Sequence, residues 1–289
     1  MTSTLSSSPD DEGEPERSAH YLNPTIFFII FFFACNPPLN PQEERKQMKI
    51  SLPDSTAKQT VKQKPKKKKT IYITFDDGPN KGTSQVLRVV NDEQLPVSFF
   101  VVGEHVYGST WQQQQWDSLL SCSYAEIYNH SYTHANHNRF VSFYKNDSSV
   151  VADFKRCHDS LLLTTTIART PGRNIWRTPM ITSTDIQQSK AAADSLYQNG
   201  FTVVGWDAEW FYTSDSLKLK QTGEEMFQQV DSLLNHQKTK TPGHIVLLTH
   251  DQSFADSADA SHLQKFIRLV KTREDYGVEF VSRYPGLKQ

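Results

Sequence analysis

Residues 71–79 read IYITFDDGP, a short β-branched and aromatic run that ends in two aspartates and a Gly-Pro turn. The run predicts a strand over 71–75, with Asp76 and Asp77 emerging at its carboxyl end. Taken alone, Asp-Asp-Gly-Pro is a common turn sequence. The two carboxylates therefore indicate chemistry only if other reactive residues join them.

From about Thr70 onward, short strand-like runs alternate with longer amphipathic stretches, which predicts an α/β fold. Further strands are expected over 97–102, 125–129, 201–206, 244–249 and 278–282. Helices are expected over 82–94, 147–165, 184–199, 223–236 and 256–272. In such folds reactive residues collect at the carboxyl ends of the strands, where the loops converge.

Two more predicted strands end in histidines. The strand over 125–129 runs into His130 and His134, spaced so that the first turn of a helix would point both rings the same way. The strand over 244–249 runs into His250. Two histidines with one carboxylate suit zinc or a similar divalent ion, although a surface helix start is the alternative for the histidine pair. We expect these three strand ends to line one pocket.

Five short motifs follow one another along this region, namely TFDDG (74–78), NHSYTH (129–134), RTPG (169–172), WDAEW (206–210) and LTH (248–250). Together they resemble the motifs of the polysaccharide deacetylase family, the NodB-homology domains of carbohydrate esterase family 4, over 70–285. The resemblance implies a single catalytic domain with a distorted (β/α) barrel. It also implies a hydrolase that removes N-acetyl or O-acetyl groups from polysaccharides such as peptidoglycan, chitin or xylan.

Carried over position by position, the resemblance makes Asp77, His130 and His134 the metal ligands. Asp76 would be the general base and His250 the general acid. A metal ion lowers the pKa of bound water and polarises an acetyl carbonyl, while a nearby carboxylate collects the proton. The implied cofactor is a divalent ion, with zinc favoured over other divalent ions.

The third motif supplies two supporting residues. Arg169 is expected to hold Asp76 ionised and oriented, because a neighbouring guanidinium lowers the pKa of a carboxylate and can bind it bidentately, with an ordinary surface arginine as the alternative. The loop around Gly172 is the candidate donor for the tetrahedral oxyanion. The family motif usually has another residue between the proline and the glycine, whereas Gly172 follows Pro171 directly.

The fourth motif offers two acids and two tryptophans. Either Asp207 or Glu209 would stabilise the imidazolium form of His250. Trp206 and Trp210 would line the sugar or acetyl pocket, although a place in the core is an equally ordinary fate for one of them.

Residues outside the motifs receive no catalytic role. His137 is interpreted as a rim residue, and the remaining histidines, His105 among them, as surface or core residues. Cys122 and Cys157 are interpreted as two unpaired buried cysteines, with a disulfide as the alternative.

The first part of the chain predicts export and a membrane anchor. Residues 26–33 read IFFIIFFF and are followed by Ala34 and Cys35, which resembles the cleavage site of a bacterial lipoprotein. Residues 1–35 would be the leader, Cys35 the lipidated end, and 36–69 a disordered, lysine-rich tether. A buried strand is the alternative. The expected location is the bacterial cell envelope, anchored to a membrane on its periplasmic or extracellular face.

Composition argues against nucleic acid as a partner, because 37% hydrophobic residues and a formal net charge of -1 describe an ordinary globular protein. We expect residues 70–289 to act on a polysaccharide. N-acetylglucosamine in peptidoglycan is the favoured substrate, since an envelope protein meets that polymer first. An O-acetyl esterase of the xylan type and a non-catalytic carbohydrate-binding lipoprotein are the alternatives.

Overall fold

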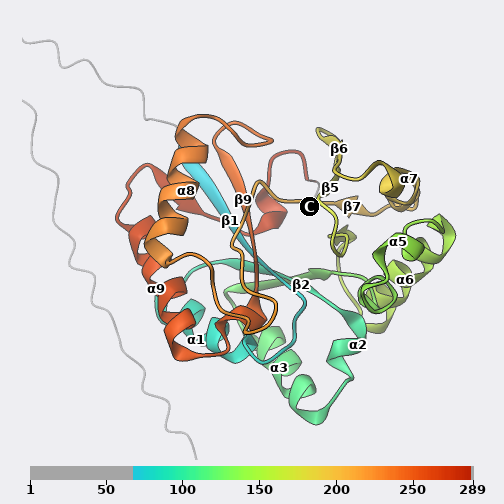
Figure 1. Ribbon diagram of the computed structural model, residues 1–289, viewed down its shortest axis with the longest axis horizontal. Coiled ribbons are helices and arrows are strands. Elements are labelled where there is room, and N and C mark those ends of the chain that lie inside the picture. The colour runs from blue at the N-terminus through green and yellow to red at the C-terminus, as the bar shows by residue number, and fades with distance from the viewer. Residues whose placement is uncertain (1–67, 288–289) are drawn as a thin grey trace, which may run out of the picture. The chain divides into compact units, whose positions relative to one another are not determined.

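The computed structural model describes residues 68–287 (Figure 1). The predicted leader, the predicted lipidation site Cys35 and the predicted tether up to residue 67 lie outside the described residues.

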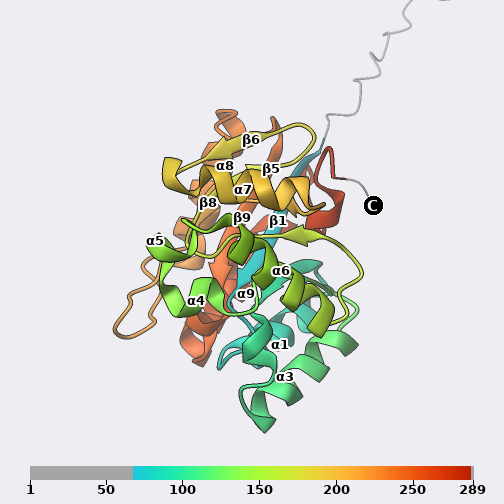
Figure 2. The same cartoon turned by 90° about the vertical axis from the view of Figure 1, so that its right-hand side faces the viewer.

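Within residues 68–287, ten strands form one curled sheet with helices packed around it (Figures 1 and 2). The strand order is β6-β5-β7-β4-β3-β2-β1-β9-β8, and β10 pairs with the start of β1. Neighbouring strands are parallel, except that β5 runs antiparallel to β6 and β7. The strands are β1 (Lys69–Asp76), β2 (Val97–Val101), β3 (Ala125–Asn129), β4 (Ile167–Ala168), β5 (Ile175–Arg177), β6 (Thr182–Thr184), β7 (Thr202–Val203), β8 (Ala208–Glu209), β9 (His244–His250) and β10 (Tyr276–Val278).

The helices lie outside this curled sheet. Helix α9 packs against both α1 and α8, and α6 packs against α7 (Figure 1). No helix among residues 68–287 combines the length and apolar character needed to span a bilayer. The helices are α1 (Thr83–Glu93), α2 (Gly103–Val106), α3 (Thr110–Ser121), α4 (His134–Asn138), α5 (Phe140–Phe143), α6 (Asp147–Ser160), α7 (Lys190–Gln198), α8 (Gly223–Asn235) and α9 (Ser257–Lys271), with 3-10 turns at Gln187–Ser189, Asp251–Phe254 and Val281–Arg283.

Strand β1 shows how the alternation of side chains positions the site. Ile71, Ile73 and Phe75 pack into the core between the sheet and the helices. Tyr72 lies in the cluster on the opposite face of the sheet, with Trp176 and Tyr284. Because successive side chains of a strand point to opposite faces, Asp76 shares the inner face with Tyr72. A carboxylate thus enters the interior at the carboxyl end of this strand.

Most of the predicted elements are confirmed, but two predicted helices and two predicted strands are wrong in extent. Helix α6 ends at Ser160, and α7 begins only at Lys190. Only Thr202–Val203 of the stretch 201–206 is a strand, and β10 ends at Val278. Beyond it, Val281 begins a 3-10 turn, and its backbone N–H donates to Ser98 Oγ at 3.0 Å instead of to a neighbouring strand. Cys122 and Cys157 are both free and buried.

Candidate active site

The register of the parallel strands brings the predicted residues to one edge of the sheet. Asp76 lies opposite His250 in the pairing of β1 with β9. On the other side of β1 come β2 and β3, and the last residue of β3, Asn129, pairs with Ala168 of β4. His130 and Arg169, which directly follow those two residues, therefore emerge beside Asp76.

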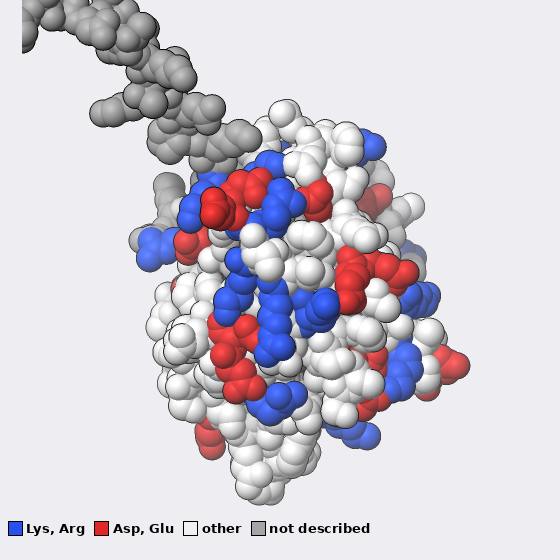
Figure 3. Space-filling view, turned by 90° about the vertical axis from the view of Figure 1, so that its left-hand side faces the viewer, with Lys and Arg blue, Asp and Glu red and all other residues white. Residues whose placement is uncertain are grey.

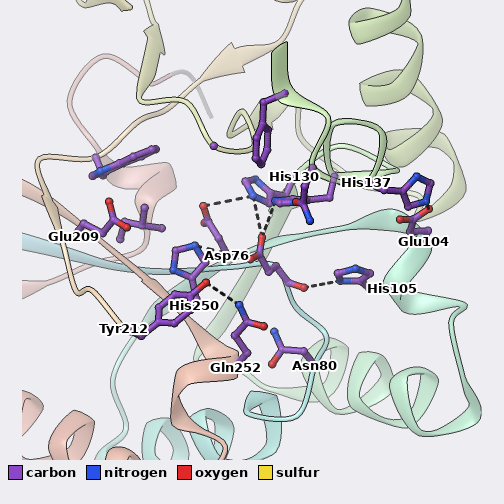
Figure 4. A pocket seen from close by; sticks show the side chains of 17 residues that line it. Asp76, Asn80, Glu104, His105, His130, His137, Glu209, Tyr212, His250 and Gln252 are labelled. Atoms are coloured by element: carbon purple, nitrogen blue, oxygen red, sulfur yellow. Dashed lines mark hydrogen bonds and ion pairs between the residues drawn. The ribbon is translucent and has the colours of Figure 1, made fainter. Parts of the chain in front are cut away.

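These strand ends surround a cavity of about 610 Å³ (Figure 4). Eight of the predicted site residues line it, namely Asp76, Asp77, His130, His134, Gly172, Trp206, Glu209 and His250. The other lining residues are Asn80, Glu104, His105, His137, Asn138, Phe140, Tyr212, Leu248 and Gln252. The cavity is therefore lined both by residues of the five motifs and by residues that lie outside them.

Asp77, His130 and His134 converge within this cavity, and their nearest ligand atoms all lie within 4.8 Å of one another. Asp77 Oδ1 is 3.3 Å from His130 Nε2 and 3.1 Å from His134 Nε2. On the far side of each ring, His130 Nδ1 lies 3.0 Å from the Arg169 carbonyl oxygen, and His134 Nδ1 lies 2.5 Å from Asn138 Oδ1. Such oxygens only accept, so Nδ1 carries a proton, and in the neutral ring Nε2 turns its lone pair toward Asp77.

Three acceptor atoms meeting in this way require positive charge between them. Asp77 Oδ1 is buried and has no hydrogen-bond partner among the described residues. Burial alone would raise the pKa of the Asp77 carboxyl, but the contacts with His130 and His134 lower the pKa well below its usual value. Imidazolium protons or a bound cation can provide the charge, and two nitrogens with one carboxylate oxygen are a donor set that fits a divalent ion such as zinc.

The backbone around these ligands is unusual. Asp77 has a φ of 73°, and its carbonyl oxygen is 2.8 Å from His105 Nδ1. The five residues of α4, from His134 to Asn138, all have positive φ. The two histidines were expected on the first turn of an ordinary helix. That expectation is wrong, because His134 begins a left-handed turn, although the rings still lie with centroids 5.2 Å apart.

Asp76 is held by a fully buried arginine. Arg169 Nη1 donates to Asp76 Oδ1 at 2.8 Å and to Thr74 Oγ1 at 2.7 Å. Its other nitrogens donate to the carbonyl oxygens of Val204 and Gly205, both at 3.1 Å. The second oxygen of Asp76 faces the candidate metal centre, 3.7 Å from His130 Nε2. The arginine therefore fixes one carboxylate oxygen and leaves the other directed into the cavity.

His250 stands on the other side of Asp77, with Nε2 3.9 Å from Asp77 Oδ2. Its Nδ1 is buried and has no hydrogen-bond partner among the described residues. Glu209 lines the same cavity, and burial raises the pKa of its carboxyl while His250 opposes that rise. The carboxylate of Asp207 instead accepts the backbone N–H groups of Lys240 at 2.7 Å and Val246 at 2.8 Å. Of the two acids that the sequence offered as partners of His250, Asp207 is therefore the wrong one. Its carboxylate binds backbone N–H groups, and the residue does not line the cavity.

The two tryptophans of the fourth motif have different fates. Trp206 lines the cavity. Trp210 is fully buried, packs against Phe254 and Phe266, and donates its indole N–H to the Gln221 carbonyl oxygen at 3.0 Å. Its predicted place in the substrate pocket is therefore wrong, because its ring belongs to the core between the sheet and the helices.

Gly172 lies where the third motif predicted, with a φ of 62°. A Cβ atom on this residue would stand 2.8 Å from the ring of Phe140. Both the backbone conformation and the neighbouring ring therefore favour glycine at this position.

Sequence reasoning missed several lining residues. His105 follows the end of β2 by four positions, so its place near a strand end was a usable signal. Tyr212 and Gln252 lie two residues beyond the fourth and fifth motifs, and Gln252 Nε2 donates to the Tyr212 hydroxyl at 2.9 Å. The Tyr212 ring meets that of His250 edge-on, with centroids 5.1 Å apart.

The sequence model of the polysaccharide deacetylase family matches residues 63–204. The chain belongs to this family. Family membership confirms the expectation of a hydrolase, a carbohydrate deacetylase at the level of the family.

Among its relatives, the peptidoglycan-N-acetylglucosamine deacetylase of Bacillus cereus is 28% identical over 155 residues, which are 53% of this chain and 48% of that protein. The bifunctional xylanase/xylan deacetylase of Cellvibrio japonicus is 31% identical over 145 residues, which are 48% of this chain and 18% of that protein. The match thus spans less than half of either relative.

A family 4 carbohydrate esterase from Streptococcus mutans has a similar structure, with a TM-score of 0.55 and 20% sequence identity. The match covers 74% of this chain and 87% of that one. At this identity the likeness concerns the fold, and it confirms the distorted barrel that the five motifs implied.

Proposed function

We propose that this polysaccharide deacetylase uses a divalent metal ion to release acetate from N-acetylglucosamine units of peptidoglycan. One observation carries the proposal: the triad of Asp77, His130 and His134 shares one cavity with the arginine-held Asp76 and with His250. These are the groups that acyl transfer to water needs, namely a cation site, a proton acceptor and a proton donor.

Asp77, His130 and His134 would hold the ion, for which zinc is the favoured identity. A bound divalent ion supplies Lewis acidity, which lowers the pKa of water and polarises a carbonyl group. The outer contacts of His130 and His134 with oxygen acceptors fix the tautomer that this role requires.

Asp76 is placed to take the proton of the attacking water. Its Oδ2 faces the candidate metal centre, while Arg169 holds Oδ1 and keeps the carboxylate from turning away. Because the arginine is fully buried, this orientation does not depend on a mobile surface side chain.

His250 would then return a proton to the leaving amine of the sugar. Its ring lines the cavity (Figure 4), with Nε2 3.9 Å from Asp77 Oδ2. Glu209, which lines the same cavity, would stabilise the charged ring. The backbone N–H of Gly172 is the candidate donor to the acyl oxygen as it gains charge.

Two considerations favour peptidoglycan as the polymer. A relative that is 28% identical is named for the deacetylation of N-acetylglucosamine in peptidoglycan. We also propose that Cys35 is lipidated and that the enzyme lies in the bacterial cell envelope, where peptidoglycan is the neighbouring polymer. Ester cleavage on xylan would use the same residues, so the experiment has to separate the two substrates.

The test is acetate release by the purified protein from N-acetylglucosamine oligomers, peptidoglycan and acetylxylan, with and without chelator and added zinc. We expect release from the first two, loss with chelator, and a decrease of roughly 10²- to 10⁴-fold in Asp76→Asn. The matched control is Asp92→Asn, which removes an exposed carboxylate whose partner among the described residues is Arg88, at 3.4 Å. Release only from acetylxylan, or release that persists in Asp76→Asn, would contradict the proposal.

A further inference from the structure

A second hollow, of about 520 Å³, adjoins the candidate active site. It is lined by Asn138, Arg139, Phe140, Val141, Ser142, Lys145 and Arg173. Asn138 and Phe140 line the active-site cavity as well, so these two side chains form a wall between the two spaces. The hollow belongs to the side of the molecule on which α4 and α5 lie (Figure 2).

The two spaces carry opposite charge. Asp76, Asp77, Glu104 and Glu209 line the active-site cavity, and its described lining includes no lysine or arginine. The described lining of the hollow includes Arg139, Lys145 and Arg173 and no carboxylate. A ligand that spans both would therefore place a neutral group in the first and an anionic group in the second.

Arg173 is the most informative of the three cations, because only 9% of it is exposed. Its guanidinium stacks on Phe140 at 5.5 Å and on Tyr144 at 5.3 Å. It donates to the Gly172 carbonyl oxygen at 2.7 Å and to Ser189 Oγ at 3.1 Å. Among residues 68–287, no carboxylate lies within ion-pair distance of it. A buried charge without a counterion is costly, so the site favours an anion.

Arg139 and Lys145 are exposed, and neither forms an ion pair within the described part of the chain. The face of α8 and α9 is different, because there the two signs lie side by side (Figure 3). On that face Arg268 and Lys271 both contact Glu93, at 2.8 and 3.0 Å. The hollow thus gathers three cations, and its described lining holds no carboxylate of the kind that Glu93 provides there.

We propose that the hollow formed by Arg139, Lys145 and Arg173 binds a carboxylate carried by the sugar next to the one that is deacetylated. The inference rests on the proposed function and narrows its substrate to an acidic glycan. A planar guanidinium held by stacking matches the geometry of a carboxylate. In peptidoglycan strands that lack the stem peptide, the lactyl group of muramic acid carries such a carboxylate, and in xylan a uronic acid does.

The experiment measures binding, so that it does not depend on turnover. The full chain carrying Asp76→Asn is titrated with a disaccharide of N-acetylglucosamine and N-acetylmuramic acid, its methyl ester, a chitin oligomer and a uronic acid-bearing xylan oligomer. The same titrations are made after adding Arg139→Gln and Lys145→Gln. The matched control adds Arg88→Gln and Lys265→Gln, which remove two exposed cations that are paired elsewhere.

We expect the Arg139→Gln/Lys145→Gln pair to weaken binding of the acidic ligands by roughly two- to fivefold for each cation removed. Binding of the ester and of the chitin oligomer should stay unchanged, and the difference should shrink at high salt. Stronger binding of the muramic acid ligand than of the uronic acid ligand would identify peptidoglycan as the source of the carboxylate.

Equal loss for acidic and neutral ligands, or no loss for either, would overturn the inference. Such a result, together with metal-dependent acetate release by the unmodified enzyme, would leave the proposed function intact. Charge-selective binding without any acetate release would instead overturn the proposed function and leave the carboxylate site standing.

Discussion

The floor of the active-site cavity and its rim differ in how their side chains are held. The floor consists of Asp76, Asp77 and His130, which line the cavity, together with Arg169, which holds Asp76. Asp76, His130 and Arg169 are at most 3% exposed, and each contacts another member of the floor. The rim consists of Glu104, His137, Asn138 and Phe140, and the His137 side chain is 64% exposed. The difference indicates that the fold fixes the chemistry, while the rim is free to decide which glycan enters.

The largest effect is expected from the floor, in Arg169→Ala. This change leaves the buried Asp76 without its counterion and frees the carbonyl oxygens of Val204 and Gly205. We expect the free energy of unfolding to fall by about 3–5 kcal/mol. Chemical denaturation measures the loss, and acetate release should fall to background. A stable variant that keeps its turnover would show that the floor is less rigid than its contacts suggest.

The two tryptophans of the fourth motif provide a matched pair of changes. Trp210→Ala removes a core ring and should lower stability by about 3–5 kcal/mol. Trp206→Ala, in the cavity lining, should lower stability less and raise KM for the glycan more. Thermal unfolding and steady-state kinetics of both variants separate the two effects. The reverse pattern would move Trp210 back into the substrate pocket.

Asp251 directly follows His250, and its buried carboxyl group makes the stability of the protein depend on pH. Burial raises the pKa of its carboxyl from 3.8 to about 7, against the opposing contacts of Thr83 and Asn80. Between these values the folded state holds a proton that the unfolded chain has lost, so its contribution to stability falls as pH rises from about 4 to about 7. The fall is up to about 4 kcal/mol.

Unfolding free energies of the natural protein and of Asp251→Asn, measured across that pH range, check this prediction. The amide does not titrate, so the difference between the two curves should change with pH. Parallel curves would mean that Asp251 has the same pKa in both states. Asp92→Asn is the control, because its side chain is 54% exposed.

The smallest effect is expected from Glu209→Gln, a change in the cavity lining outside both the floor and the rim. The variant keeps the shape of the side chain but loses the charge that faces His250. We expect kcat to fall about tenfold, as for a modest loss of electrostatic support, with KM nearly unchanged. Asp207→Gln should leave the pH profile of kcat unchanged, because its carboxylate holds backbone N–H groups. Equal shifts of the pH profile in both variants would contradict this assignment.

The floor could be predicted from the sequence because its residues directly follow strands with clear patterns. The alternation along β1 already places Asp76 on the inner face, and its register with β9 brings His250 beside it. Arg169 could be predicted only from the third motif. Strand β4, which directly precedes it, has two residues and is too short to show an alternating pattern of apolar residues.

The rim was not predictable, because it depends on contacts that leave no local pattern. Asn and His are enriched at positive φ, but no local pattern predicts five successive positive φ values from His134 to Asn138. The same turn leads into α5, which brings Phe140 over Gly172.

The place of Glu209 was not predictable either. Its neighbours Ala208 and Trp210 belong to the core between the sheet and the helices, so Glu209 between them faces the cavity. A two-residue strand is too short to reveal that alternation in the sequence.

The most direct test of the central claim is the zinc affinity of the full chain, measured by chelator competition together with acetate release in the same samples. We predict that Asp77→Asn and His134→Ala lose both, by more than the roughly 10- to 100-fold typical of an outer-shell partner. Asp76→Asn should keep the zinc and lose the turnover. Zinc affinity that survives Asp77→Asn, or acetate release by the metal-free enzyme, would contradict the account.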